Sequence, residues 1–257
     1  PAPPTTSPSE TAYDTALRSC LRRAGVPSLY PHQRDALTRL SSGGRIFQNV
    51  QTGGGKTLVP MLWSLLRRHY PKLHNRSRIV LGFSPTVALL LDMVRRFTAA
   101  GLRVWTPPRA EVEASHNAGI PSAFTRRPPP CKTTAAALEH VDAIIVTCEF
   151  FFSPVSSKAE ALAWFLLQHP DLLVWIDEAH LVYETAHTYR PNMVKMRGLT
   201  GMYPGASFLF SSATWSPRYK RGGVQFFFPR YSVGDALPVQ FIEGSIAALQ
   251  TSLAAAG

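Results

Sequence analysis

Short, almost continuously apolar stretches alternate with segments of helical periodicity along most of this chain. Apolar runs bounded by polar or turn residues predict β-strands that are covered on both faces, and they lie at 45–50, 78–84, 142–147, 171–177 and 207–212. Apolar positions at helical spacing predict α-helices at 11–24, 31–41, 55–69, 86–100, 157–168 and 191–199. This alternation predicts an α/β fold, a doubly wound and mostly parallel sheet with helices on both faces.

The chain has 257 residues, which suffice for one large domain or two small ones. We expect a disordered leader at 1–10, a domain at 11–215 with a long surface insertion at 106–135, and an extension of that domain or a linker at 216–257. No apolar run approaches the roughly 18 residues of a membrane helix, so no membrane partner is expected.

The balance of charge is strongly basic, with 27 Lys and Arg against 16 Asp and Glu and a formal net charge of +11. Such a surface suits a polyanionic partner, because each phosphate that is neutralised releases counterions; a merely solubilising surface is the alternative. Cys20, Cys131 and Cys148 are far apart, with neither zinc-type pairing nor a disulfide framework. This favours a reducing, intracellular compartment, which would be the nucleus in a eukaryote.

The stretch "VQTGGGKT", from Val50 to Thr57, lies between a predicted strand and a predicted helix. Glycines let backbone N–H groups approach phosphate oxygens without a clashing Cβ, and the helix adds the positive end of its dipole. Lys56 can reach the β- and γ-phosphates, and the Thr57 hydroxyl can bind Mg²⁺. Val50 departs from the usual pattern, which has glycine there. The candidate cofactor-binding residues are Thr52, Gly53, Gly54, Gly55, Lys56 and Thr57.

A second constellation, "LLVWIDEAH", ends another buried strand. In a doubly wound sheet Asp177 would lie beside the phosphate loop. There its carboxylate can hold Mg²⁺ through water, and Glu178 can orient or deprotonate the attacking water. The alternative is that Asp177 and Glu178 only end a strand and cap the next helix. The agreement of loop, topology and spacing favours a site for ATP and Mg²⁺.

With both motifs in place, the chain resembles the first RecA-like lobe of a superfamily 2 helicase, whose motif II reads "DEAH". The resemblance covers roughly 11–215 and is closer to the RecQ family than to RNA-directed branches. It implies that Lys56, Asp177, Glu178 and His180 are catalytic. It also implies that Gln33, in "YPHQRDAL", reads adenine by donating and accepting hydrogen bonds together, although an ordinary surface glutamine is an alternative.

Further segments carry the same resemblance. "FSPTVALLLDMVRRF" is similar to the RecQ motif Ia, "IIVTCEFF" to the family's Thr-Pro-Glu segment, and "SSAT" to motif III, which links hydrolysis to nucleic-acid binding. "DEAHLVYETAHTYRP" follows the spacing of the aromatic-rich loop after motif II, with Thr185 in place of its tryptophan. These segments imply nucleic-acid-binding or coupling roles for Ser84, Pro85, Thr86, Thr147, Glu149, His187, Tyr189, Arg190, Ser211 and Thr214.

Some of these positions have a second explanation. Ser84, Thr86 and Thr147 can cap helices, and capping can coexist with phosphate contacts. Tyr189 can stack on a base or pack as a half-buried aromatic residue.

The resemblance implies the ATP-binding lobe of an ATP-dependent DNA helicase that moves 3′–5′ and binds single-stranded or forked DNA in preference to RNA. Such a motor needs a second RecA-like lobe, which supplies an arginine finger. The chain by itself is therefore expected to hydrolyse ATP slowly and to unwind nothing. A non-catalytic nucleic-acid-binding remnant of such a lobe, and another superfamily 2 ATPase such as an RNA helicase, are the alternatives.

Overall fold

The computed structural model describes residues 11–73, 77–112, 137–153, 156–185, 191–214, 217–228 and 239–244. The leader expected at 1–10, residues 113–135 of the expected insertion, with Cys131, and the tail beyond 244 lie outside these ranges. Within the described ranges, every helix is too short or too polar to cross a membrane.

The described strands form one sheet in the order β3-β4-β2-β5-β6-β1-β7, and every neighbouring pair is parallel. The five predicted strands are confirmed, although β2 and β5 begin later than expected. β3 and β7 were not predicted, because β3 has only two residues and β7 is a partly exposed edge strand. The strands are β1 Arg45–Val50, β2 Val80–Ser84, β3 Val104–Trp105, β4 Ala143–Thr147, β5 Leu173–Ile176, β6 Ser207–Ser212 and β7 Gln240–Gly244.

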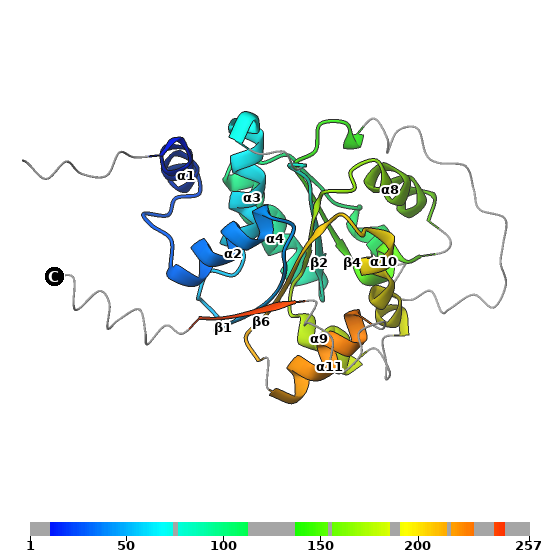
Figure 1. The fold of residues 1–257 in the computed structure, drawn as a ribbon. Helices are drawn as coiled ribbons and strands as arrows, with labels where there is room; N and C mark the ends of the chain where they lie inside the picture. Colours follow the sequence, from blue (N-terminus) through cyan, green and yellow to red (C-terminus); the bar gives the residue numbers. More distant parts are fainter. Residues whose placement is uncertain are drawn as a thin grey trace, which may run out of the picture.

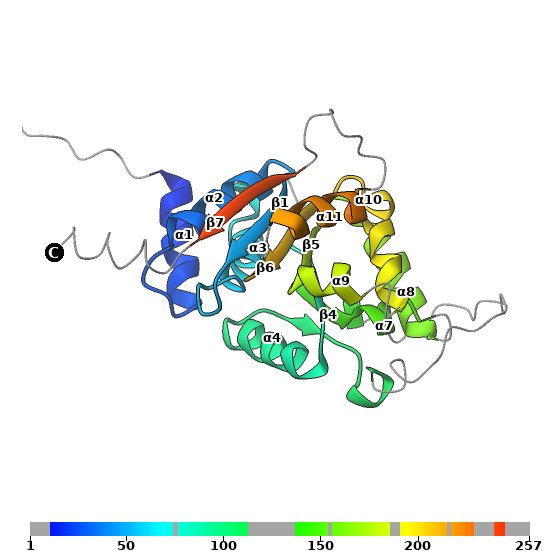
Figure 2. The same ribbon diagram turned by 90° about the horizontal axis from the view of Figure 1, so that it is seen from below.

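Helices cover both faces of this sheet (Figure 1), and the view from below shows the same two layers (Figure 2). One layer holds α1 Ala12–Arg23, α2 Pro31–Ser41, α3 Leu58–His69 and α4 Val87–Ala99, with the 3₁₀ helix η1 Pro71–Leu73 after α3. The other layer holds α7 Cys148–Phe151, α8 Ser157–Leu167, α9 Ala179–Thr185, the 3₁₀ helix η2 Pro191–Gly198, α10 Leu199–Met202 and α11 Pro217–Phe227.

The central strands feed two hydrophobic cores, one on each face, because successive side chains of a strand point to opposite faces. In β5, Val174 and Ile176 join the core under α7 to α11. Leu173 and Trp175, which alternate with them along the strand, join the core under α1 to α4. Burial on both faces explains why these strands read as continuous apolar runs, and it confirms the predicted doubly wound fold.

Two helix predictions need correction. The α-helix predicted at 191–199 is a 3₁₀ helix over most of its length, and Met193, Met196 and Leu199 are all buried. Their three-residue spacing matches the period of a 3₁₀ helix, so the apolar pattern was real but its period was misjudged. The helix predicted at 55–69 begins only at Leu58, because Gly55 has a positive φ of 74° that an α-helix cannot include.

The fold continues beyond residue 215, where the apolar pattern weakens. β7 pairs in parallel with β1 at the edge of the sheet. Phe227 of α11 packs on Phe210 of β6, with ring centroids 4.5 Å apart. The described residues of 216–257 therefore belong to the same sheet and the same core as 11–215.

Candidate nucleotide-binding site

The segments singled out in the sequence meet at one edge of the sheet. We call it the carboxyl edge, because all the parallel strands end there, and we call the opposite edge the amino edge. β5, β6 and β1 are neighbours, so the loops that follow Ile176, Ser212 and Val50 lie side by side. α9 lies at this edge at the bottom of Figure 1, and α3 rises from it to the amino edge at the top.

The phosphate loop has the backbone that its glycines predict. Gly53 and Gly55 have φ values of 84° and 74°, which residues with a Cβ rarely adopt. At Gly54, a Cβ would lie 2.4 Å from Cγ1 of Val50. The valine that replaces the expected glycine is therefore compatible with the loop, because it packs against a position without a side chain.

Lys56 lies between the loop and motif II. Its Nζ atom donates to the carbonyl of Val50 at 3.1 Å and is 3.9 Å from Oε1 of Glu178. Only 10% of the side chain is exposed. The ammonium group is thus held inside the loop, close to the carboxylates that follow β5.

Asp177 follows the last residue of β5, and its backbone N–H donates to the carbonyl of Phe83 at 3.0 Å. Its carboxyl group is buried, and within the described residues no hydrogen bond reaches its Oδ1 atom. Burial raises the pKa of Asp177 to about 7; the charge of Glu178 adds to this effect, and Lys56 opposes it. A buried acceptor without a partner is costly, so this carboxyl group is suited to a ligand that brings a positive charge.

Together these groups fit a nucleotide phosphate with Mg²⁺. The loop offers backbone N–H groups and an ammonium group to phosphate oxygens, and Asp177 offers an unsatisfied carboxylate oxygen. Mg²⁺ is usually held by one or two carboxylates, phosphate oxygens and water. Thr57 occupies the N-cap of α3, and its side chain makes no capping hydrogen bond there, which leaves the hydroxyl available for the ion. Thr52 is exposed at the start of the loop.

Glu178 has φ 45°, a left-handed conformation that is rare for residues other than glycine. Backbone strain of this kind costs on the order of 1 kcal/mol or more and is concentrated at functional sites. Its Oε2 atom is 3.4 Å from Nδ1 of His180, and 24% of the side chain is exposed. Glu178 is therefore open to solvent, as a base that acts on water must be.

His180 connects motif II to the end of β6. Its Nδ1 atom lies 2.8 Å from Oγ of Ser212, which also accepts a hydrogen bond from the Thr214 backbone at 3.0 Å. The sequence pointed to Ser211 and missed Ser212. Ser211 is fully buried inside the sheet, where it accepts a hydrogen bond from Trp175 at 3.2 Å. Strand alternation could have separated the two serines, because β6 has consecutive polar residues and only one of them can lie on each face.

Gln33 is buried, so it is not an ordinary surface glutamine, and that alternative is excluded. Its Oε1 atom accepts from the backbone of Tyr30 at 2.9 Å, and its Nε2 atom donates to the carbonyl of Gly55 at 3.1 Å. His32, which the sequence did not single out, lies 3.1 Å from the carbonyl of Gly54 through Nε2. The start of α2 therefore fixes the phosphate loop by hydrogen bonds to its backbone carbonyls. In this structure both ends of the Gln33 amide contact protein and position the loop, and its contact with adenine stays a prediction.

Five of the residues implied in nucleic-acid binding or coupling lie at the carboxyl ends of β2 and β4: Ser84, Pro85, Thr86, Thr147 and Glu149. Ser84 and Thr147 are register partners on these strands, and both are buried. Thr86 caps α4 by accepting from Leu89, and Thr147 caps α7 by accepting from Phe150, both at 3.3 Å. Capping is therefore confirmed for these two threonines. Thr86 and Thr214 are exposed, whereas Pro85 and Glu149 are buried.

His187, Tyr189 and Arg190, implied by the aromatic-rich loop, lie outside the described residues. Thr185, which stands in place of the loop's tryptophan, is buried at the end of α9. Its hydroxyl donates to the carbonyl of Leu181 at 2.7 Å. At this position the chain therefore has a buried hydroxyl that is hydrogen-bonded within its own helix, in place of the aromatic ring of tryptophan.

The raised pKa of Asp177 predicts a pH dependence of stability. Without nucleotide, the folded protein keeps this proton up to about pH 7, whereas the unfolded chain loses it near 3.8. The folded state therefore binds more protons in this window, and the free energy of unfolding falls as pH rises through it. We expect Asp177→Asn to be more stable than the wild type by a few kcal/mol at about pH 8 and similar to it at about pH 4. Denaturant unfolding at both pH values measures this.

The control for that experiment is Glu184→Gln, which changes an exposed carboxylate on α9. It should shift stability little at either pH. A stability difference between Asp177→Asn and the wild type that is the same at both pH values would contradict the raised pKa.

Comparisons with known proteins agree with this geometry. At 26% identity, the chain is similar to the ATP-dependent DNA helicase Q-like 4B of Arabidopsis thaliana over 209 residues, which are 78% of this chain and 16% of that protein. It is 24% identical to the RecQ-like DNA helicase BLM of Xenopus laevis over 205 residues, which are 78% of this chain and 13% of that protein. The chain thus spans less than a fifth of the length of either relative.

Solved structures share the fold. A hypothetical ATP-dependent RNA helicase from Sulfolobus tokodaii superimposes with a TM-score of 0.54 at 16% identity, over 92% of this chain and 59% of that one. The DUF1998 helicase MrfA, in its complex with DNA, gives a TM-score of 0.58 at 19% identity, over 93% of this chain and 30% of that one. The family model for the DEAD/DEAH box helicases matches residues 30–221. The chain, with its phosphate loop and DEAH motif at one edge of a parallel sheet, belongs to the DEAD/DEAH box helicase family.

Proposed function

We propose that this chain is the ATP-binding lobe of a RecQ-like DNA helicase, which binds ATP with Mg²⁺ at the carboxyl edge and hydrolyses it to drive strand separation. The observation that carries the proposal is the approach of Lys56 to within 3.9 Å of Glu178, beside the buried carboxyl group of Asp177. Loops that are far apart in the sequence supply a phosphate-binding cation and two carboxylates to the same place.

Each residue has a role that follows from its surroundings. The amides around Gly54 and the Lys56 ammonium bind the phosphates, and Thr57 and Asp177 hold Mg²⁺. The ion supplies charge neutralisation at the transferring phosphoryl group. Glu178 accepts a proton from the attacking water, since it is the more exposed member of the acidic pair. The Nδ1 atom of His180 lies near both Oε2 of Glu178 and Oγ of Ser212, and so connects motif II to the end of β6.

The same contacts suggest how hydrolysis is coupled to nucleic acid. Asp177 is bonded to Phe83, the residue before Ser84, so motif II and motif Ia share one stretch of the sheet edge. Ser212 ties His180 to Thr214, which is exposed. A nucleic-acid strand that crosses the ends of β2 and β4 would lie next to the first of these contacts, whereas Thr214 follows β6, which is two strands from β2. We therefore place the bound strand over Thr86 and Thr147, at the starts of α4 and α7.

The choice of DNA over RNA rests on the two curated relatives, both of which are named as DNA helicases. Their greater length also supports a second RecA-like lobe in the complete protein, because the chain covers only 16% and 13% of them. That lobe would supply the arginine finger, which is worth about 10³–10⁵ in rate in related systems. We expect slow hydrolysis by this lobe alone and 3′–5′ movement by the complete protein.

Stimulation of ATP hydrolysis by nucleic acid tests this function in the full-length protein. We expect single-stranded and forked DNA to raise turnover, and RNA of the same sequence to raise it less. Lys56→Ala, as the control, should show no turnover with either. Equal stimulation by RNA would support an RNA helicase, and no hydrolysis at all would support a non-catalytic nucleic-acid-binding lobe.

A further inference from the structure

The amino edge carries a cluster of arginines around one buried carboxylate. Asp142 immediately precedes β4 and is completely buried. It forms ion pairs with Arg68 from the last turn of α3, with Arg78 before β2 at 3.1 Å, and with Arg103 before β3 at 3.2 Å. The backbone of Arg103 also donates to Asp142 at 2.9 Å. Asp142 thus ties together the starts of three neighbouring strands and the end of a helix.

This cluster has more positive charge than the carboxylate needs. One guanidinium group would neutralise Asp142, and three surround it. The side chains of Arg68, Arg78 and Arg103 remain 28%, 37% and 46% exposed. Each is held by Asp142 on one side and reaches solvent on another, which gives an excess of positive charge at fixed positions. Fixed guanidinium groups lose less side-chain entropy when they bind an anion.

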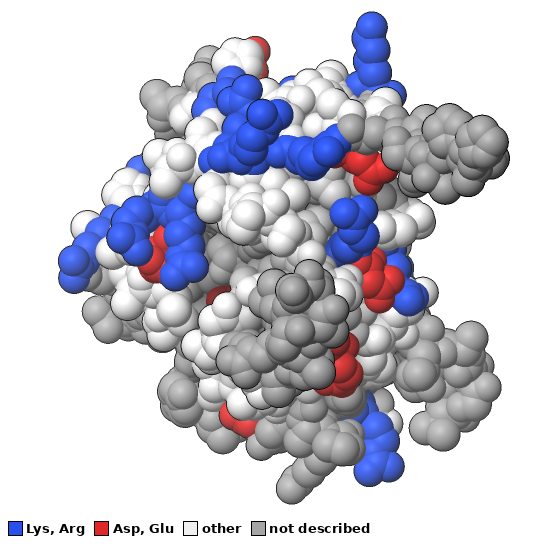
Figure 3. Space-filling view, turned by 90° about the vertical axis from the view of Figure 1, so that its left-hand side faces the viewer, with Lys and Arg blue, Asp and Glu red and all other residues white. Residues whose placement is uncertain are grey.

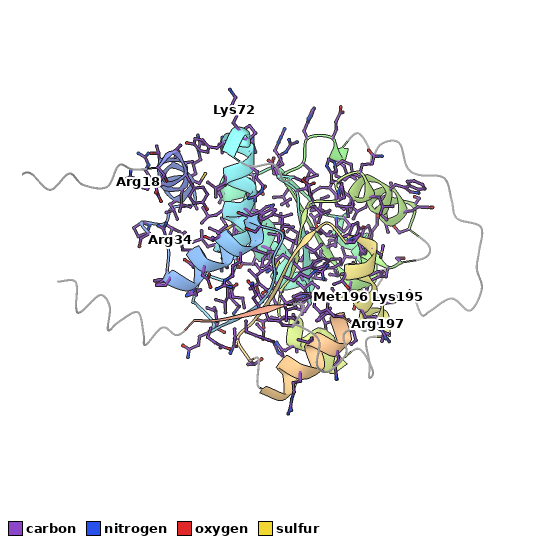
Figure 4. The ribbon with its side chains drawn as sticks, in the orientation of Figure 1. Arg18, Arg34, Lys72, Lys195, Met196 and Arg197 are labelled. Atoms are coloured by element: carbon purple, nitrogen blue, oxygen red, sulfur yellow. The ribbon has the colours of Figure 1, made fainter. Side chains whose placement is uncertain are left out.

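Other basic residues extend the same surface. Arg22 and Arg23 end α1, Lys72 follows α3, and all three are exposed. Figure 4 shows Lys72 at the top of the molecule, where α3 reaches the amino edge, and Figure 3 shows Lys and Arg gathered over the upper half of the α1 side. Burial lowers the pKa of His69, the charges of Arg23 and Arg68 lower it further, and the charge of Asp142 opposes them. His69 is therefore close enough to the end of α1 and to the Asp142 cluster to feel the charges of both.

Helix dipoles explain only part of this arrangement. Basic residues are favourable in the last turn of a helix, which accounts for Arg22, Arg23 and Arg68. Arg78 and Arg103 precede strands and have no such reason to be basic. Apart from Asp142, two acidic residues lie near these arginines. Asp171 accepts a hydrogen bond from the backbone of Ser77, next to Arg78, and Glu139 is exposed three residues before Asp142. They leave a basic excess.

We propose that this amino-edge surface, made of Arg22, Arg23, Arg68, Lys72, Arg78 and Arg103, binds the phosphate backbone of duplex DNA. It rests on the proposed function only in assuming that the protein meets DNA. Single strands are usually held on aromatic side chains that stack with bases. Among the described Phe, Tyr and Trp residues, the exposed side chains are Tyr30 and Trp164, on elements that contribute nothing to this surface. Near the surface, Tyr70 is partly buried and the small ring of His140 is exposed. A surface of cations alone suits a duplex, which presents phosphates and keeps its bases stacked inside.

The test uses the variant Arg22→Gln/Arg23→Gln/Lys72→Gln. It removes the positive charges of the three residues of this surface that do not contact Asp142, so that the buried cluster stays intact. Binding of a fluorescent DNA duplex to the whole chain is measured over a range of salt concentrations. We expect the slope of log K against log salt to become shallower by about 2 to 3, because each lost phosphate contact removes about 0.9. Binding of a short single strand and of an ATP analogue should not change.

The matched control is Arg39→Gln/Arg95→Gln/Lys158→Gln, which removes the same charge from residues that are paired with Asp35, Asp92 and Glu111. It should keep the wild-type slope. Equal slopes for the two triple variants would overturn the inference and leave the proposed function standing. A wild type that binds the short single strand but not the duplex would also overturn it. Failure to bind either DNA would overturn both.

Discussion

Lys56→Ala is expected to weaken binding of a fluorescent ATP analogue, in the presence of Mg²⁺, by at least about 10-fold. The lysine is nearly buried inside the phosphate loop, so its ammonium group meets the phosphates away from bulk water. Hydrogen bonds to charged groups contribute about 1.5–3 kcal/mol each, which corresponds to a loss of about 10- to 150-fold in affinity. Lys56 also lowers the pKa of Asp177, so its removal makes that carboxyl group harder to ionise and the metal harder to hold.

Lys72→Ala is the matched control, because it removes an exposed lysine at the opposite edge of the sheet. It should bind the analogue as the wild type does. Equal binding by Lys56→Ala and the wild type would show that the phosphate loop is not the nucleotide site. It would also favour the reading of the chain as a non-catalytic remnant.

Glu178→Gln is expected to keep ATP binding and to lose turnover. The amide has nearly the same shape but cannot accept the proton of the attacking water, and general-base catalysis typically contributes about 10²–10⁴ in rate. Binding should be retained or slightly tighter, because Glu178 is one of the groups that raise the pKa of Asp177. Nucleotide binding and DNA-stimulated hydrolysis are measured on the same preparation of full-length protein.

Glu184→Gln changes an exposed carboxylate on α9, the short helix that follows Glu178, without touching the site, and should hydrolyse ATP at the wild-type rate. Persistent turnover in Glu178→Gln would mean that another group activates the water. Loss of both binding and turnover would instead assign Glu178 a structural role through its contacts with Lys56 and His180.

The sequence was sufficient for the architecture, because strands buried on both faces leave uninterrupted apolar runs and the glycine loop has a distinctive composition. It placed the phosphate loop and Asp177 at the same edge of the sheet, because parallel strands all end at one edge, although β6 lies between the two strands that carry them. The edge strand β7 could not be found in this way, since its pattern is only half buried. The 3₁₀ helix over Pro191–Gly198 was missed because its three-residue period resembles a weak α-helical one.

The finer contacts of the site depend on which way side chains point, and that depends on the fold. Ser211 and Ser212 are adjacent in the sequence but lie on opposite faces of β6, so only Ser212 reaches His180. The contacts of Gln33 and His32 with the phosphate loop join α2 to a loop about twenty residues away, and no local pattern encodes such a pairing. The strained backbone of Glu178 has no sequence signature either.

The proposed function requires one shared pocket for phosphates and metal at the carboxyl edge. A crystal structure of the chain with a non-hydrolysable ATP analogue and Mn²⁺ in place of Mg²⁺ tests this most directly, because Mn²⁺ is located by its anomalous scattering. We predict phosphates on the amides around Gly54 and a single Mn²⁺ between Thr57 and the carboxylate of Asp177. A nucleotide bound elsewhere on the chain, or an ion remote from Asp177, would contradict it.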